Sequence, residues 1–382
     1  DTGHRDKAVN EYKRLVRTYP ESQYVPDAYV QIGEYYFDKN EATKALFAYQ
    51  AATRYRDSTQ YAFAMYKLAW CEYNVGEYGK AIDTMKAVVA YSMTDSANTD
   101  AKKRLTLQDE ALKDLVRFFA DAGNMDEAYT YFTKLGKKDL IQQMLKRLAA
   151  MYFEQGKFEQ SIQTYRRLIR ENPNSPKAPD YQNEIILSYQ KINRKRETLA
   201  EIQVLLDQYG KNSAWARANA SDPDAIRAAD IFVEKNLRTV AQNYQIEADK
   251  LGKGKQAAEA YELAEKAYSV YLREFPEGKY TYDMRFAYGE LLYKLKKYDI
   301  AYDEYVKVVQ TDPKGQHSLF CSESAIYAAG EMRKVEVAEG RGPKKPAKGD
   351  LSEIPLTEWE ERYLAATRLY DQHFSEQDDN RG

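Results

Sequence analysis

Hydrophobic residues recur with the spacing i, i+3, i+4 and i+7 along most of the chain, the pattern of helices that bury one face. Glycine and proline fall mostly between these stretches, where they end helices and form turns. Period-two alternation bounded by tight turns, which strands require, is absent over any useful length. The pattern therefore predicts an all-α protein.

The predicted helices follow a repeat in which a small residue and a large residue stand four positions apart. The step from Ala8 to Ala45 is 37 residues, and that from Ala45 to Ala81 is 36. Because four residues make about one helical turn, both residues of a pair lie on one face and can pack against a neighbouring helix. The small residues are Ala8, Ala45, Ala81, Ala128, Ser161, Thr198, Ala264, Ala301 and Ala366, and the large ones are Tyr12, Tyr49, Met85, Phe132, Tyr165, Ile202, Tyr268, Tyr305 and Tyr370.

A second helical stretch precedes most of these pairs, and Gly33 and Gly289 occupy the same position in two such stretches. Residues that tolerate the left-handed conformation separate the two helices of a block. Proline follows several blocks and cannot continue a helix. Each block is thus predicted to be a helical hairpin, with turns at Asn40, Gly76, Gly123, Gly156 and Asn193 and with breaks at Pro20, Pro173, Pro276 and Pro313.

Three stretches depart from the regular spacing. The step of 66 residues from Thr198 to Ala264 contains residues 225–250, which predict one long helix capped near Ser221 or Asp222. The step of 47 residues from Ala81 to Ala128 implies extra turns at about residues 93–103, and residues 338–355, rich in Gly, Pro and Lys, predict a mobile loop. That loop interrupts the last hairpin, whose helices we expect near residues 319–335 and 357–374.

These departures suggest a division of the chain into three segments. We expect an N-terminal repeat array over residues 1–210, an irregular long-helix repeat followed by a regular one over 211–315, and an interrupted repeat over 316–382. The first block opens on its second helix, so we also expect the chain to be a fragment or a processed product.

Over about residues 5 to 315 the chain resembles the tetratricopeptide repeat family. In that family a large residue, Leu-Gly or Leu-Ala and an aromatic mark the first helix, and Ala, an aromatic, Ala and Pro mark the second. The resemblance implies a right-handed α-solenoid of about eight to nine stacked hairpins, some irregular, and a protein or peptide partner bound on the concave surface. The repeat-joining strings at 19–22, 172–175 and 275–278 resemble those of a subclass in bacterial cell-envelope proteins, which includes the outer-membrane assembly lipoprotein and the Tol-Pal-associated coordinator.

The resemblance also implies which side chains line the groove, because the family's groove residues recur on first helices. Tyr66, Trp70 and Tyr73 are the strongest candidates, since tyrosine and tryptophan are frequent at interface hot spots. The alternative is that these aromatic side chains pack against the next repeat. The complete candidate set is Val30, Glu34, Phe37, Asp38, Phe63, Tyr66, Trp70, Tyr73, Asn74, Phe286, Glu290 and Tyr293. With Glu34, Asp38 and Glu72 nearby, such a groove suits a ligand with apolar and basic anchors.

Composition removes several other functions. The 57 basic and 59 acidic residues give a net charge of −2, which disfavours nucleic acid as a partner. Cys71 and Cys321 form no metal-binding motif, and the three histidines stand in no catalytic motif, so we expect no metal, no cofactor and no enzyme activity. No apolar run approaches the roughly 20 residues that span a bilayer. Short basic runs are explained by solvation, with contact to an anionic membrane or glycan as the alternative.

Three roles remain open at this stage. The first is a non-catalytic scaffold that binds a partner protein, in a bacterial envelope assembly by resemblance. The second is a structural spacer within a larger repeat protein. The third is an accessory domain of a complex that acts on peptidoglycan or another glycan. Envelope and cytoplasm both remain possible compartments.

Overall fold

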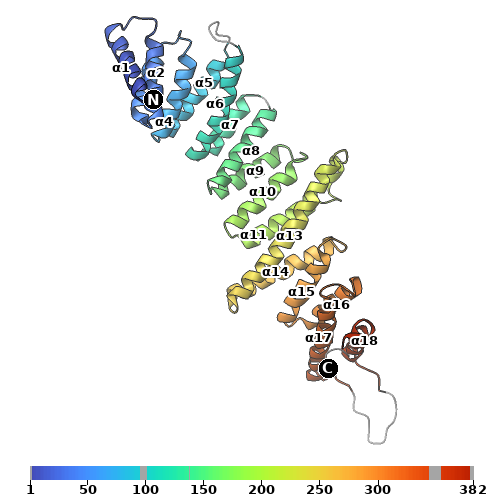
Figure 1. Ribbon diagram of the computed structural model, residues 1–382. Helices are drawn as coiled ribbons and strands as arrows, with labels where there is room; N and C mark the ends of the chain where they lie inside the picture. The colour runs from blue at the N-terminus through green and yellow to red at the C-terminus, as the bar shows by residue number, and fades with distance from the viewer. Residues whose placement is uncertain (1, 95–100, 137, 344–353, 379–382) are drawn as a thin grey trace. The chain divides into compact units, whose positions relative to one another are not determined.

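The structure, a computed structural model, describes residues 2–94, 101–136, 138–343 and 354–378 (Figure 1). These residues form eighteen helices and contain no strand, which confirms the predicted all-α class. The chain divides into two compact units, Asp1–Ile192 and Asn193–Gly382. The first unit contains α1 (Thr2–Thr18), α2 (Val25–Asp38), α3 (Ala42–Ala52), α4 (Tyr61–Asn74), α5 (Tyr78–Ser92), α6 (Ala101–Ala122), α7 (Met125–Lys134), α8 (Lys138–Glu154), α9 (Phe158–Glu171) and α10 (Ala178–Lys191). The second contains α11 (Lys195–Tyr209), α12 (Ala214–Ala218), α13 (Pro223–Leu251), α14 (Lys255–Glu274), α15 (Thr281–Lys294), α16 (Tyr298–Thr311), α17 (Ser318–Ala338) and α18 (Glu358–Asp378).

Within each unit successive helices pack as hairpins, as an α-solenoid of repeats requires. The predicted small residues all lie on second helices, and those from Ala45 to Ala366 are buried, whereas Ala8 on α1 is exposed. Their large partners are buried from Tyr49 to Tyr305 and half-buried at Tyr12 and Tyr370. The small and large pairs therefore form the packed seam between neighbouring helices.

The predicted turns are also confirmed by the backbone. Asn40 and Asn193 have φ angles of 56° and 55°, and Gly76, Gly123 and Gly156 likewise have positive φ. Lys296 occupies the equivalent place before α16 with φ 61°, although a lysine gives no left-handed signal in the sequence.

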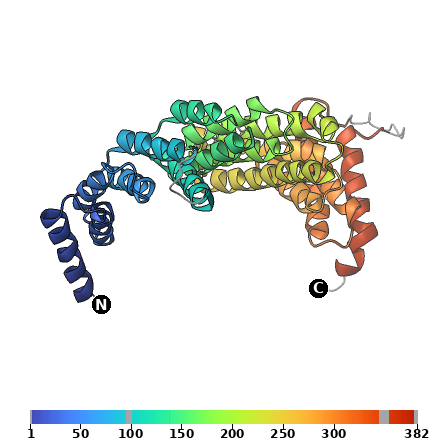
Figure 2. The same cartoon turned by 90° about the horizontal axis from the view of Figure 1, so that it is seen from above.

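The irregular region contains the longest hairpin of the second unit, α13 packed along α14, seen in yellow and gold in both views (Figures 1 and 2). Asp222 caps α13 as predicted, because its carboxylate accepts a hydrogen bond from the Ala225 amide at 3.0 Å. The sequence did not predict the short α12, which Ser213 caps through the Ala216 amide.

The two other departures are only partly described. The longer step before Ala128 includes the 22-residue α6. Of the residues at which extra turns were predicted, about 93–103, those from 95 to 100 lie outside the described residues, and 101–103 belong to α6. The helices on either side of the last interruption are α17 and α18. Most of the predicted mobile loop, residues 344–353, lies outside the described residues. The first compact unit ends at Ile192, and the three-segment division with its boundary at residue 210 stays a prediction.

A tyrosine ring explains why glycine occupies the same position in α2 and α15. A Cβ atom added to Gly33 would stand 2.6 Å from the ring of Tyr49, and one added to Gly289 would stand 2.8 Å from the ring of Tyr305. Both tyrosines lie on the second helix of the same hairpin. In both α2 and α15, glycine thus leaves room for a tyrosine ring to pack directly on the helix backbone.

The last helix begins with a capping box that the sequence pattern did not single out. Thr357 Oγ1 accepts a hydrogen bond from the Glu360 amide, and the Glu360 carboxylate accepts one from the Thr357 amide. The Thr357 hydroxyl also donates to the buried Glu336 of α17 at 2.7 Å. We expect Thr357→Ala to reduce the free energy of unfolding of the second unit by about 1–2 kcal/mol, measured by urea denaturation. Thr357→Ser keeps both hydrogen bonds and is the matched control; equal stability of the two variants would contradict the cap.

Candidate functional site

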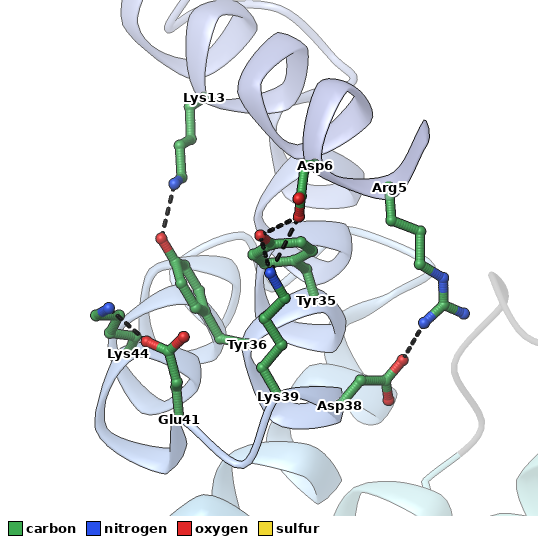
Figure 3. A network of polar contacts seen from close by, with 9 residues as sticks. All are labelled: Arg5, Asp6, Lys13, Tyr35, Tyr36, Asp38, Lys39, Glu41 and Lys44. Carbon is green, nitrogen blue, oxygen red and sulfur yellow. Dashed lines mark hydrogen bonds and ion pairs between the residues drawn. The ribbon is translucent and has the colours of Figure 1, made fainter. Parts of the chain in front are cut away.

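At the N-terminal end of the first unit, α1 and α2 form a cleft of about 260 Å³. Glu34 and Asp38, both predicted groove residues, line this cleft. Figure 3 shows how polar contacts join the two helices: Arg5 of α1 donates to Asp38 at 2.7 Å, and Tyr35 donates to Asp6 at 2.5 Å. The hydrogen bonds from Tyr35 and from Lys39 lower the pKa of Asp6. The cleft therefore has an ionic rim on both sides.

Beside the cleft, Glu34 binds a lysine of the next repeat. Lys67 of α4 forms an ion pair with Glu34 at 2.8 Å, and Tyr49 donates a hydrogen bond to the same carboxylate. The Lys67 ammonium also lies 4.3 Å from the ring centre of Phe37 and 5.6 Å from that of Phe63. We call this arrangement the Lys67 site. A carboxylate and two aromatic rings thus surround one ammonium group.

The three strongest candidates form an aromatic face on α4, defined here as Tyr66, Trp70 and Tyr73. All three side chains are half-buried. Tyr66 and Trp70 both donate to Asp114 of α6, at 2.5 Å and 3.0 Å, and Tyr73 donates to Asp121 of α6. Burial, followed by the hydrogen bond to Asp114, raises the pKa of the Tyr66 hydroxyl. The polar atoms of this face are therefore satisfied by the next first helix, and its rings are only partly exposed.

Sequence reasoning missed the α6 residues that hold this face. Asp114 and Asp121 stand seven residues apart, on one side of the helix, and Arg117 lies between them with its guanidinium 5.6 Å from the rings of Trp70 and Tyr73. The sequence could have indicated these residues through the seven-residue spacing of the two aspartates, on a helix whose other side is continuously apolar.

The other predicted residues of the first unit differ in how they are presented. Val30 is 3% exposed and belongs to the core, so the structure offers it to no partner. Asn74 is exposed at the end of α4. Glu72, expected beside the groove, instead receives a hydrogen bond from Thr84 of α5, and burial raises its pKa. Its position in the chain places it on the side of α4 that faces the second helix of the same hairpin.

The predicted residues of the second unit cluster on α15. Phe286 stacks on His317 with ring centres 3.8 Å apart and meets Phe320 edge-on at 5.7 Å. Glu290 accepts a hydrogen bond from Tyr305 at 2.5 Å. Tyr293 packs edge-on against Tyr298 at 5.1 Å. Phe286 and Tyr293 lie seven residues apart, with Glu290 between them, so all three share one face of the helix.

The remaining chemistry is sparse within the described residues. They contain no group of histidine, cysteine and carboxylate side chains that could bind a metal ion. None of their helices has the length and apolar character needed to cross a bilayer. Cys71 and Cys321 are buried, and burial raises the pKa of each thiol to about 12. Neither thiol is available as a nucleophile in this structure.

Taken with the fold, these surfaces define an α-helical repeat protein with binding candidates on its first helices. Family models of the tetratricopeptide repeat match residues 26–59, 63–91 and 147–175. Within these three stretches the chain is therefore similar to tetratricopeptide repeats. A search of curated proteins finds no match to the chain.

The solved structures that match this chain share little sequence with it. The complex titled Naa15/Naa10 bound to HypK-THB is 14% identical, with a TM-score of 0.30, and the match covers 91% of this chain and 57% of that one. The TPR domain of P58(IPK) is 14% identical with a TM-score of 0.24, covering 97% and 95%. The TPR2AB-domain:pHSP90 complex of yeast Sti1 is 14% identical with a TM-score of 0.24, covering 91% and 100%.

Proposed function

We propose that this protein is a non-catalytic scaffold that binds a partner protein or peptide on the first helices of the Asp1–Ile192 unit. Tetratricopeptide repeats generally mediate protein–protein interaction. The observation that carries the proposal for this surface is the aromatic face, whose Tyr66, Trp70 and Tyr73 side chains are fixed by hydrogen bonds to α6 while their rings stay partly exposed. Because those rotamers are already fixed, this chain loses little side-chain entropy when a partner binds there.

The charge around this face favours a partner with basic and apolar anchors. Asp114 and Asp121 lie beside the rings, and Glu34 and Asp38 line the neighbouring cleft. Arg117 is the cation over the aromatic face. Three of these four carboxylates already pair with a cation, Asp38 with Arg5, Glu34 with Lys67 and Asp121 with Arg117. The surplus of one carboxylate over these three cations supports recognition of lysine or arginine flanked by apolar side chains.

The bacterial envelope assembly remains part of the proposal, supported by the resemblance of the repeat-joining strings. The alternatives are a spacer within a larger repeat protein and an accessory domain of a peptidoglycan- or glycan-acting complex. A spacer uses its ends or its second helices rather than the aromatic face, so the location of partner contacts separates it from the scaffold.

Trp70→Ala should reduce capture of the partner strongly. Loss of a hot-spot tryptophan costs about 2 kcal/mol of binding free energy, or about thirtyfold in affinity. The experiment is affinity purification with the full-length protein from its native cell, with quantification of the captured partner by mass spectrometry. Phe47→Ala is the control, since Phe47 is 65% exposed on the second helix α3. Circular dichroism monitors the fold of both variants.

Site-specific photocrosslinking at the same surfaces tests the spacer alternative. A photoreactive phenylalanine analogue at Phe37 should crosslink to the partner, and the same group at Phe47 should not. If Phe47 crosslinks and Phe37 does not, or if Trp70→Ala binds as well as Phe47→Ala, the proposed surface is wrong.

A further inference from the structure

The carboxylate of the Lys67 site has an equivalent in the second unit. Glu34 and Glu290 each stand ten positions after the N-cap residue of their helices, α2 and α15. Each follows a glycine on which a tyrosine ring packs, and each accepts a hydrogen bond from that ring's hydroxyl, from Tyr49 or from Tyr305. The two units thus position the same half-buried carboxylate by the same device.

The aromatic rings of the Lys67 site also have equivalents. Phe37 and Tyr293 each lie three residues after the glutamate on the same helix. Phe63 and Phe320 each lie three positions after the N-cap of the next first helix, α4 or α17. Phe320 is 46% exposed. The frame that surrounds an ammonium group in the first unit is therefore repeated in the second.

The cation itself has no equivalent. Lys67 stands seven positions after the N-cap of α4, and the residue at that position of α17 is Ser324. Within the part of the chain that the structure describes, no lysine or arginine forms an ion pair with Glu290. The nearby Lys334 pairs with Glu331 at 2.6 Å on its own helix. The second unit thus has the carboxylate and the rings without the lysine.

We propose that Glu290, Tyr293 and Phe320 bind the cationic side chain of a lysine or arginine from the partner. This inference rests on the proposed function, because it takes the cation to come from a bound protein or peptide. Tyr305 fixes the carboxylate, and the carboxylate with the two rings supplies the charge-assisted and cation–π contacts that Lys67 makes in the first unit. The site therefore selects a basic residue at a second point, on the Asn193–Gly382 unit.

The first test measures binding of three synthetic pentapeptides to the full chain by calorimetry at low ionic strength. The peptides are acetyl-Gly-Leu-X-Leu-Gly-amide with X as lysine, arginine or norleucine, the last being uncharged. We expect the lysine or arginine peptide to bind about tenfold more tightly than the norleucine peptide, and we expect Glu290→Gln to remove that difference. Added salt should weaken the same preference. Equal binding of all three peptides, or no binding of a cationic one, overturns the inference.

The second test fills the site from within. Ser324→Lys places an ammonium group at the position of Lys67 and should abolish the preference for the cationic peptide, whereas Ser324→Ala should keep it. Reciprocally, Lys67→Ser should open a second site for the cationic peptide in the first unit. If Ser324→Lys and Ser324→Ala bind the peptide equally, the correspondence has no functional meaning. If partner capture depends on Trp70 but Glu290→Gln leaves the peptide preference unchanged, this inference alone is overturned. If Glu290→Gln removes the peptide preference but partner capture does not depend on Trp70, only the proposed aromatic face is overturned.

Discussion

Replacing Gly33 with alanine is expected to lower the free energy of unfolding of the first unit by about 1–3 kcal/mol. The added methyl group would stand 2.6 Å from the ring of Tyr49, which is fully buried and is held by its hydrogen bond to Glu34. In an open helix the same change stabilises by roughly 1 kcal/mol, because alanine is the better helix former. The close approach of the ring should therefore reverse the usual sign. Urea denaturation of the full chain, followed by helical circular dichroism, measures the change.

Gly79 provides the matched control for this prediction. It lies in α5, and a Cβ atom added there would meet nothing within 4 Å. Gly79→Ala should therefore leave the unit as stable as before or more stable. A double-mutant cycle adds a second check, since Tyr49→Ala should cost less in the Gly33→Ala background than in the original chain. If Gly33→Ala and Gly79→Ala change the free energy of unfolding equally, the Tyr49 ring is not the reason for glycine at position 33.

Arg285→Met is expected to destabilise the second unit by about 2–4 kcal/mol. Arg285 of α15 and Glu304 of α16 form an ion pair at 2.5 Å, and their side chains are only 13% and 9% exposed. Methionine fills the volume of the arginine stem but leaves the Glu304 carboxylate buried without this partner. The cost follows from that carboxylate, so it should fall sharply when Glu304→Leu is added to the same chain. Urea denaturation of the two variants measures the difference.

Lys307 tests whether burial or mere pairing matters. It also pairs with Glu304, at 2.8 Å, but its side chain is 50% exposed. Lys307→Met should therefore change stability by less than about 1 kcal/mol. If Lys307→Met lowers the free energy of unfolding as much as Arg285→Met does, burial of the Arg285–Glu304 pair is not the cause of the destabilisation.

The repeat frame was predictable because packing requires it in the blocks from Ala45 onward. A small residue must lie where two helices approach, and Ala45, Ser161 and Thr198 satisfy that requirement equally, so size rather than identity carried the signal. The turns followed from φ preferences at residues such as Asn40. The same reasoning missed Lys296, whose positive φ is imposed by the hairpin around it, and α12, which is too short to show a period.

The candidate site was predictable only to the level of a helix face. Helical spacing places Tyr66, Trp70 and Tyr73 together, yet it does not reveal that carboxylates of α6 take their polar atoms, because that contact joins positions 44 to 48 residues apart. Val30 shares a first helix with Glu34 but is buried in the core, since the inner edge of a groove and the core are adjacent on one helix. Which side chains contact one another between repeats can be learned only from the three-dimensional structure.

The placement of the two cysteines, one in each compact unit and both buried, gives each half of the protein its own reporter. A thiol-specific alkylating reagent can modify Cys71 or Cys321 only when the surrounding helices separate transiently. Peptide mapping after timed exposure would thus give two independent opening rates from one untouched chain. Whether the two units open together or separately becomes measurable without introducing a cysteine by mutation.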